Sequence, residues 1–423
     1  MASAVWGEES YKGKVMFIIS FGCAKAATNL IVGPLADWYG RRVTLIAGMI
    51  LGLPVPIVVL FAQSWSLVVV VNVLFGVSQG LIGSSLIFMM VDVFGLSAKG
   101  TAVGISECTI YSSVATVSIA AAALADAYGY RPIPFLIGAL VGAIGLAASF
   151  LVTDTMDLVA AQQAAATGAT LDAAHDAGFV EEVPLAEMGS IDPATSAETG
   201  LIPVSHTNAN ANANANAIAS SPTVTRAILG LATNRNFILV AVCGLVSKGQ
   251  DAVIWGLAPE FLETRHGLSL AATGLIIGLY TGAWGLSQLA FGSLSDTYGR
   301  KLFLTGGMAA NTVAILLFVA TPDLTPWLPL RIILWSLSMV LLGIGTASIY
   351  PTMQAAAADE VEPAWRGSSL GIYRAIRDFG LAVGALSVSS VADAVGLEWS
   401  FVALAVVVGL VGASIAFGYV NRS

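Results

Sequence analysis

A short polar segment occurs twice in this chain, and each copy joins the end of one long apolar stretch to the start of the next. Residues 33–42 read GPLADWYGRR, and residues 292–301 read GSLSDTYGRK, 259 positions later. A polar connection that returns between hydrophobic stretches indicates a membrane protein built from two related halves. Internal duplication of this kind is typical of proteins that work by alternating access.

A second pair of landmarks supports the duplication. Asp92 is followed by Lys99 and Gly100, and Asp359 is followed by Arg366 and Gly367, at an offset of 267. Two independent landmarks at nearly equal offsets are hard to obtain by chance. The repeat therefore extends well beyond the two signature segments, as residues 33–42 and 292–301 are called below.

The composition identifies the bilayer as the solvent of most of the chain. Of the 423 residues, 57% are hydrophobic and only 10% are charged, whereas soluble domains carry about 25% charged residues. The net charge of −8 misleads, because residues 154–222 hold nine acids and no lysine or arginine. The acidity belongs to one connecting segment, so it does not indicate a basic partner, and no nucleic-acid partner is expected.

Because a membrane span needs about 20 mostly apolar residues, eleven spans are predicted. They are residues 15–35, 43–62, 66–91, 101–125, 132–152, 236–258, 268–290, 302–320, 329–357, 367–391 and 398–420. Residues 1–14 form a short tail that is neither a signal peptide nor a span. The fold class is therefore all-α integral membrane, with two pseudo-symmetric helical bundles.

The bundles are expected at 15–152, with five spans, and at 231–423, with six. Between them, residues 153–230 form an acidic linker with few aromatic residues and an alternating Asn-Ala tract, which we expect to be disordered. Nine basic residues flank the spans on the side of the signature segments and five on the other. This bias places the linker and the C-terminus in the cytosol.

Several other classes of site find no support. The three cysteines, Cys23, Cys108 and Cys243, stand singly in apolar stretches, and the three histidines are scattered. Neither a disulfide framework nor a zinc site follows from that pattern. No cofactor is expected, the glycine-rich runs lack the strand–loop–helix setting of a nucleotide site, and no catalytic constellation indicates an enzyme.

The signature segments resemble the motif G-x-L-a-D-x-x-G-R-[RK] of the major facilitator superfamily, and the resemblance covers the chain outside the linker. It is also strong at residues 244–256 and 366–380. The resemblance implies twelve spans in two six-helix bundles, a central cavity and a rocker-switch motion. The family motif follows the second span of each half, yet one span precedes Gly33 here. The first helix of the N-terminal bundle is thus expected to be missing, through a truncated gene model or in an eleven-span protein.

The signature segments are the predicted conformational gate. Glycine permits tight turns and close backbone approach, and a carboxylate is favoured at a helix N-terminus. The basic residues are expected to pair with acids, and the resemblance implies Asp92 and Asp359 as partners. The alternative is that the bases are anchors on the cytosolic side. The full predicted gate is Gly33, Asp37, Gly40, Arg41, Arg42, Asp92, Gly292, Asp296, Gly299, Arg300, Lys301, Asp359 and Arg366.

Charges inside the spans are the second group, because burying an ionisable group in a bilayer costs several kcal/mol. They are Lys25, Glu107, Lys248, Asp251, Arg374, Arg377 and Asp378. At about 1.5 Å per residue, Lys25 and Arg374 lie about 12 and 11 Å from their cytosolic helix ends, and Asp378 about 17 Å. The resemblance brings these helices together, so a Lys25–Asp378 ion pair is predicted.

Two interpretations of these charges stay open. Arg374 and Asp378, four apart, and Lys248 and Asp251, three apart, are spaced to neutralise each other on one helix face. Alternatively the charges bind substrate or couple protons. Arginine suits an anionic substrate, and Glu107 is the first candidate for a proton carrier because no base lies within a helical turn of it.

Aromatic and amide residues near these charges are candidates for completing a pocket, with ordinary packing as the alternative. They are Tyr111, Gln250, Trp255, Trp284, Gln288, Tyr350 and Tyr373.

The function predicted first is a secondary active transporter that moves a small solute across a membrane, driven by a gradient. Proton antiport of an amphipathic compound and proton symport of an organic anion both stay open, with a slight preference for a polar or anionic solute. A non-transporting receptor-like protein or truncated pseudotransporter is the alternative, motivated by the missing helix. We expect a multi-pass monomer in the lipid bilayer.

Overall fold

The computed structural model describes residues 2–94, 99–156, 158, 231–361 and 366–421, although the side chains of 99–103 and 366–369 are not part of that description. The predicted disordered linker lies almost entirely outside the described residues, as does the side chain of Arg366. The described part of the chain before the linker and the part after it form one compact unit.

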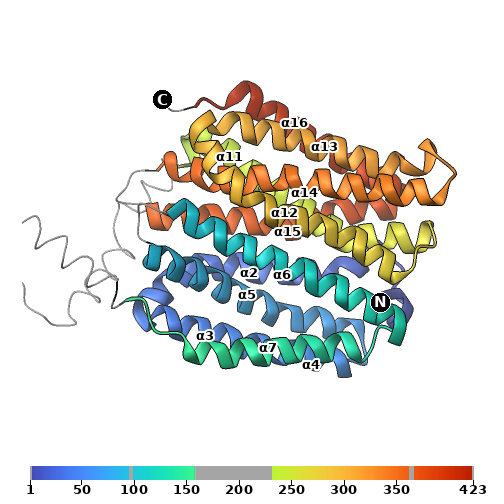
Figure 1. Ribbon diagram of the computed structural model, residues 1–423, viewed down its shortest axis with the longest axis horizontal. Helices are drawn as coiled ribbons and strands as arrows, with labels where there is room; N and C mark the ends of the chain where they lie inside the picture. Colours follow the sequence, from blue (N-terminus) through green and yellow to red (C-terminus); the bar gives the residue numbers. More distant parts are fainter. Residues whose placement is uncertain (1, 95–98, 157, 159–230, 362–365, 422–423) are drawn as a thin grey trace, which may run out of the picture. The chain divides into compact units, whose positions relative to one another are not determined.

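The described chain is helical throughout. Before the linker the helices are α1 (Ala2–Trp6), α2 (Tyr11–Tyr39), α3 (Arg41–Gly52), α4 (Pro54–Phe61), α5 (Trp65–Phe94), α6 (Lys99–Tyr128) and α7 (Ile133–Leu151). After it come α11 (Arg235–Glu260), the π-helical turn η2 (Phe261–Arg265), α12 (Leu270–Tyr298), α13 (Arg300–Leu324), α14 (Leu328–Asp359), α15 (Arg366–Val395) and α16 (Leu397–Gly418). Figure 1 shows them as one stack of long, roughly parallel rods.

Eleven helical segments of the described chain are long and apolar enough to cross a membrane, and they confirm all eleven predicted spans. Helices α3 and α4 together make one span, Arg41–Phe61. The break falls at Pro54, the first residue of α4, because proline lacks the amide hydrogen that would continue the helical ladder. The chain is a multi-pass integral membrane protein.

The order of helices repeats between the two halves. Helices α2, α3/α4, α5, α6 and α7 correspond in sequence order to α12, α13, α14, α15 and α16, with the signature segments ending α2 and α12. In the described chain α11 has no counterpart before the linker. In Figure 1 the helices α3, α4 and α7 lie at the lower side of the stack and α13 and α16 at the upper side, so each half forms its own layer.

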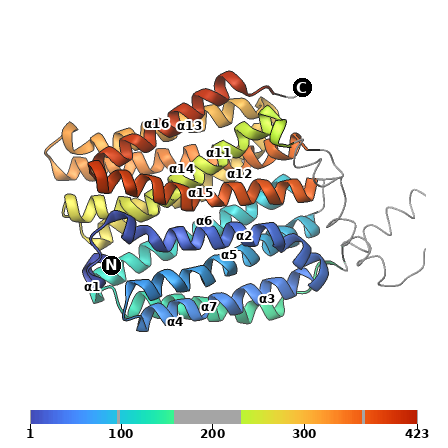
Figure 2. The ribbon, with the colours of Figure 1, turned by 180° about the vertical axis from the view of Figure 1, so that it is seen from behind.

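The halves meet along two long helix pairs. Helix α2 packs against α15, and α6 packs against α12, as Figures 1 and 2 agree. Small residues allow the approach: a Cβ added at Gly22 would lie 2.7 Å from the Cβ of Leu381, and one at Gly274 would lie 2.0 Å from the Cβ of Ala122. Close packing of small residues is the usual way in which membrane helices associate.

Each signature segment is helical except at one glycine, whereas a polar connection between spans was expected. Helix α2 continues through Gly33 to Tyr39, and the chain turns at Gly40, where φ is +90°. The second copy turns in the same way at Gly299, where φ is +89°. The close backbone approach expected at Gly33 is not found, because no atom of the described residues lies within 4 Å of an added Cβ. At Gly292 the nearest described atom is at an ordinary 3.9 Å.

The turn glycines generate a prediction about stability. At Gly40 and Gly299 the backbone has φ near +90° and ψ near 150°, a region that side chains avoid at a cost of about 1–3 kcal/mol. Gly40→Ala and Gly299→Ala should each lower the midpoint of thermal unfolding of the detergent-purified protein. The matched control is Gly306→Ala in α13, where an added Cβ has no atom of the described residues within 4 Å. That change should be neutral or stabilising by about 0.5–1 kcal/mol, and equal losses in all three variants would contradict the explanation.

Candidate functional site

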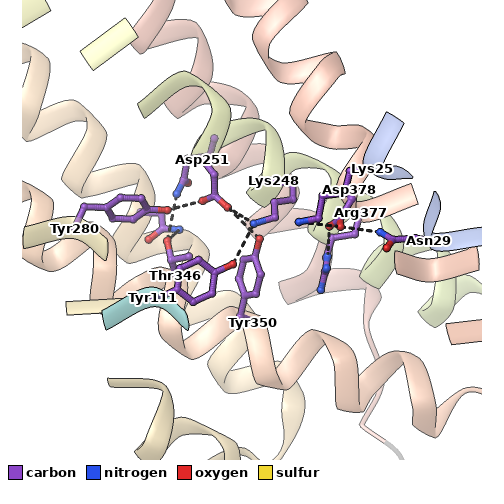
Figure 3. A network of polar contacts seen from close by, with 12 residues as sticks. Lys25, Asn29, Tyr111, Lys248, Asp251, Tyr280, Thr346, Tyr350, Arg377 and Asp378 are labelled. Carbon is purple, nitrogen blue, oxygen red and sulfur yellow. Dashed lines mark hydrogen bonds and ion pairs between the residues drawn. The ribbon is translucent and has the colours of Figure 1, made fainter. Parts of the chain in front are cut away.

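The carboxylate of Asp378 on α15 joins charged and polar groups from both halves. It is fully buried and accepts hydrogen bonds from Arg377 Nε at 2.7 Å and from Asn29 Nδ2 at 2.8 Å. Lys25 Nζ lies 3.4 Å from its Oδ2. The predicted contact between Lys25 and Asp378 is therefore present, and Figure 3 shows the donors converging on the carboxylate.

Positive charge exceeds negative charge around Asp378. The predicted i, i+4 neutralisation of Arg374 by Asp378 is not found, because Arg377 and Lys25 are the cations within 4.0 Å of that carboxylate. Arg374 has no hydrogen bond or ion pair within the described residues, and its Nε is buried without a partner. Two cations share one carboxylate, and a third is unpaired one turn away.

A second charged centre lies on α11. Lys248 Nζ is 2.9 Å from Asp251 Oδ2, and both side chains are buried, so the i, i+3 neutralisation considered for this pair is present. The hydroxyl of Tyr350 donates to Asp251 Oδ2 at 3.0 Å, and that of Tyr280 donates to Oδ1. Asp251 thus accepts from three helices, α11, α12 and α14, which fixes them around one buried carboxylate (Figure 3).

Four aromatic rings surround the ammonium group of Lys248. Its Nζ lies 4.8–5.8 Å from the ring centroids of Tyr350, Trp284, Trp255 and Tyr111, distances at which a cation is attracted to a ring face. Tyr111 belongs to α6 of the first half, stacks on Trp284 with centroids 3.6 Å apart, and accepts a hydrogen bond from Lys248 Nζ at 3.3 Å. The cage therefore spans the boundary between the halves.

The other predicted pocket residues are distributed unevenly. Gln250 is buried and donates to Thr346 Oγ1 on α14 at 3.3 Å, so it contributes to packing within the second half. Glu107 on α6 is half-buried and makes no hydrogen bond or ion pair with the described residues. Gln288 and Tyr373 are buried, and their polar side-chain atoms have no hydrogen-bond partner in the part of the chain that the structure describes.

Sequence reasoning missed two members of these centres, Asn29 and Tyr280. Asn29 stands one helical turn after Lys25 in an otherwise apolar run, which is a readable signal that both side chains share a face. Tyr280 precedes Trp284 and Gln288 at intervals of four, so the three lie on one face of α12. The periodicity of polar groups in an apolar helix would have found both.

The arginines that begin α3 and α13 make equivalent ion pairs. Arg41 Nε is 2.6 Å from Asp92 Oδ2, and Arg300 Nε is 3.2 Å from Asp359 Oδ2. The pairs implied for Asp92 and Asp359 are therefore present. Each one joins helices of the same half, α3 to α5 and α13 to α14, so neither bridges the two halves in this conformation.

Asp37 and Asp296 do not cap a helix N-terminus as expected. Each pairs instead with the arginine four residues later, because the turn at Gly40 or Gly299 leaves that guanidinium on the same face. The N-termini of α3 and α13 are capped by residues that sequence reasoning missed. Asp154 Oδ2 accepts from Arg42 N at 3.0 Å and Asn421 Oδ1 accepts from Lys301 N at 3.1 Å, each three residues beyond the last helix of its half.

The remaining basic gate residues behave differently from one another. The side chain of Arg42 donates to the carbonyl of Phe150 at 2.7 Å, whereas that of Lys301 forms no ion pair within the described residues. Arg366, the last predicted gate residue, has its side chain outside the described residues.

A sequence profile of the Major Facilitator Superfamily matches residues 14–246 and 240–423. The chain is similar to the uncharacterized MFS-type transporter YybF of Bacillus subtilis (strain 168), with 31% identity over 130 residues, 31% of this chain and 29% of that protein. It is similar to human protein spinster homolog 1, with 28% identity over 186 residues, 43% of this chain and 34% of that protein. The matches span about a third of these curated relatives.

Solved structures of POT family transporters share the fold. One in complex with a thioalcohol conjugated peptide aligns with a TM-score of 0.65 over 97% of this chain and 88% of its own, at 12% identity. Another, in complex with 5-aminolevulinic acid, gives the same values. The matching profile, the duplicated signature segments and the shared arrangement of helices together place this chain in the Major Facilitator Superfamily of membrane transporters.

Proposed function

We propose that this protein is a proton-coupled secondary transporter of a small organic anion, bound between the halves at the cluster of Lys25, Arg374, Arg377 and Asp378. The surplus of positive charge in that cluster carries the proposal. Superfamily membership supports secondary transport, and the cluster supports the class of solute.

The unpaired guanidinium is the reason to expect an anion. Arg374 is half-buried, and its Nε is buried without a partner within the described residues. An unpaired charge inside a membrane protein is costly, and a guanidinium presents forked donors that match a carboxylate or phosphate. An anion that contacts Arg374 would remove that cost. The Lys248–Asp251 pair, by contrast, is already neutral and hydrogen-bonded on several sides, so it has no comparable need of a ligand.

Unpartnered polar groups near the charged centres support a ligand there. Trp284 Nε1, both polar atoms of the Gln288 side chain and the Tyr373 hydroxyl are buried without partners within the described residues. Buried polar groups are almost always satisfied in folded proteins. Several such groups on α12 and α15, the helices that form the boundary between the halves, fit a polar solute that would satisfy them.

Glu107 is the proposed proton carrier. It lies half-buried on α6 without an ion-pair partner in the described structure. A carboxylate that takes up a proton when a monoanion binds would leave the loaded site with the same net charge as the empty site during the conformational change. This favours symport of the anion with a proton over antiport.

The anion claim is tested by ligand-induced stabilisation. Mono- and dicarboxylates and phosphate monoesters should raise the thermal midpoint of the purified protein, whereas organic amines and sugars should not. A ligand at 100 times its Kd stabilises by about 2.7 kcal/mol. Arg374→Gln should abolish the shift. The control Lys12→Gln, which removes an exposed charge, should retain it, and stabilisation by amines alone would contradict the proposal.

Proton coupling is tested by measuring uptake of the anion into proteoliposomes that contain no substrate at the start. Uptake of the stabilising anion should rise at least tenfold when a pH gradient, acidic on the side of anion addition, is imposed. Glu107→Gln should bind the anion with unchanged stabilisation but show uptake that ignores the gradient, because the carboxylate that carries the proton is gone. Gradient-dependent uptake in Glu107→Gln would exclude this residue, and uptake indifferent to pH in the unmodified protein would exclude proton coupling.

Transport rates of substituted proteins test whether the signature arginines act through their ion pairs, as a conformational gate, or only as positively charged anchors. Asp92 is 10% exposed and Asp359 is 44% exposed, and exposed ion pairs contribute little. Arg41→Gln should therefore slow transport more than Arg300→Gln does, by about tenfold. Lys301→Gln removes a charge from the same turn without breaking an ion pair and should have little effect. Equal effects of all three changes would favour the anchor interpretation, in which only positive charge matters.

A further inference from the structure

The halves also touch at the end of the spans opposite to the signature segments, called the distal end below. There the N-terminus of α2 meets the C-terminal end of α15, and the N-terminus of α12 meets that of α6 (Figure 2). Asp393 of α15 accepts hydrogen bonds from Tyr11 N at 2.7 Å and Lys12 N at 3.1 Å. Asp126 of α6 accepts one from Leu270 N at 3.1 Å.

These two contacts are copies of each other under the internal duplication. Asp126 and Asp393 are 267 residues apart, the offset of Asp92 and Asp359, and Tyr11 and Leu270 are 259 apart, the offset of the signature segments. The serines before them, Ser10 and Ser269, obey the same offset and cap the same helices, accepting from Gly13 N at 2.9 Å and Ala272 N at 3.2 Å. Both copies thus retain the serine cap and the carboxylate that accepts from the first residue of the helix, whereas the second hydrogen bond, from Lys12 N, occurs in one copy among the described residues.

The electrostatics of helix ends makes each contact depend on the conformation. The first amides of a helix have no intrahelical partner and attract a carboxylate. Asp126 and Asp393 stand in the last turn of their own helices, α6 and α15, where the negative end of the dipole disfavours a carboxylate. Each acid is therefore badly placed on its own helix and well placed against the helix of the other half.

We infer that Asp126 and Asp393 are a paired latch, positioning residues that hold the distal end shut in one conformation of the cycle and release it in the other. Separating the halves at this end would expose free amides on α2 and α12 and return both carboxylates to unfavourable helix ends. The ion pair of Lys14 Nζ and Glu260 Oε1 at 2.7 Å also joins the halves there. It has no second copy, because α11 has no counterpart in the described first half.

The test of the latch needs no substrate. A negative result would therefore overturn the latch without bearing on the anion proposal. A Cβ added at Gly282 lies 3.7 Å from that of Ala115, within the range of about 3.5–4.5 Å that a disulfide requires. In a background with Cys23, Cys108 and Cys243 changed to alanine, A115C/G282C reports closure by disulfide yield. A115C alone reports opening by its rate of reaction with a membrane-impermeant maleimide, applied to right-side-out or to inverted vesicles.

Asp126→Ala with Asp393→Ala should raise maleimide labelling from the distal side about tenfold and lower the disulfide yield, with each single change intermediate. Asp126 accepts one hydrogen bond through one oxygen, and Asp126→Asn keeps an amide oxygen that can accept it, so this change should raise labelling only slightly. Asp393→Asn loses one of two and should label faster. The control Asp323→Ala removes an exposed acid of α13 that makes no hydrogen bond or ion pair within the described residues, and it should match the parent.

Labelling of the double alanine variant at the parent rate, in protein that elutes as a single species and unfolds at the parent temperature, overturns the latch. Where the double alanine variant does not fold, the two asparagine variants decide. Faster labelling of Asp393→Asn than of Asp126→Asn supports the latch, and parent rates in both overturn it.

Discussion

The cost of placing charge where water is absent governs this structure. Asp378 is wholly buried near the middle of α15, and an isolated carboxylate there would carry a penalty of several kcal/mol. It persists because Lys25 and Asn29 of α2 and Arg377 of α15 all point at it. The requirement for partners from both helices fixes the register of α2 against α15. That register in turn sets which residues of the two halves meet elsewhere.

The two halves share one scaffold but divide the chemistry. The second half holds the self-neutral pair on α11 with the tyrosines that brace it, and its helices are fastened to one another around Asp251. The first half contributes single groups, Lys25, Asn29 and Tyr111, that reach across the boundary. A motion between the halves would therefore separate Lys25 from Asp378 and Tyr111 from Lys248 while leaving the Lys248–Asp251 pair intact. Binding of a ligand between the halves can therefore change the contacts across the boundary, but not those within one half.

How far the sequence predicts the molecule depends on the range of the interaction. The eleven spans follow from apolar length alone, since the bilayer imposes it. The Lys25–Asp378 contact was predicted from helix depth together with the family resemblance, which implies that the two helices meet. Helix depth does not predict which of several neighbouring cations pairs with Asp378. Arg377, next in sequence, hydrogen-bonds the carboxylate and Arg374 does not, because side-chain rotamers and surrounding residues determine the pairing. The caps by Asp154 and Asn421 lie more than a hundred residues from the amides that they serve, which no local pattern reveals.

The two ends of the molecule differ in which contacts can change during a cycle. The ion pairs of Arg41 and Arg300 lie within one half, so a rigid-body motion of the halves leaves them unaltered. They can brace the helix ends that meet the other half, but cannot by themselves favour one conformation. The hydrogen bonds of Asp126 and Asp393 cross between halves and must break when the distal end separates. Only interactions that differ between conformations shift their populations. The distal carboxylates and the Lys14–Glu260 ion pair cross between the halves and can therefore bias this conformation directly, whereas the signature arginines cannot.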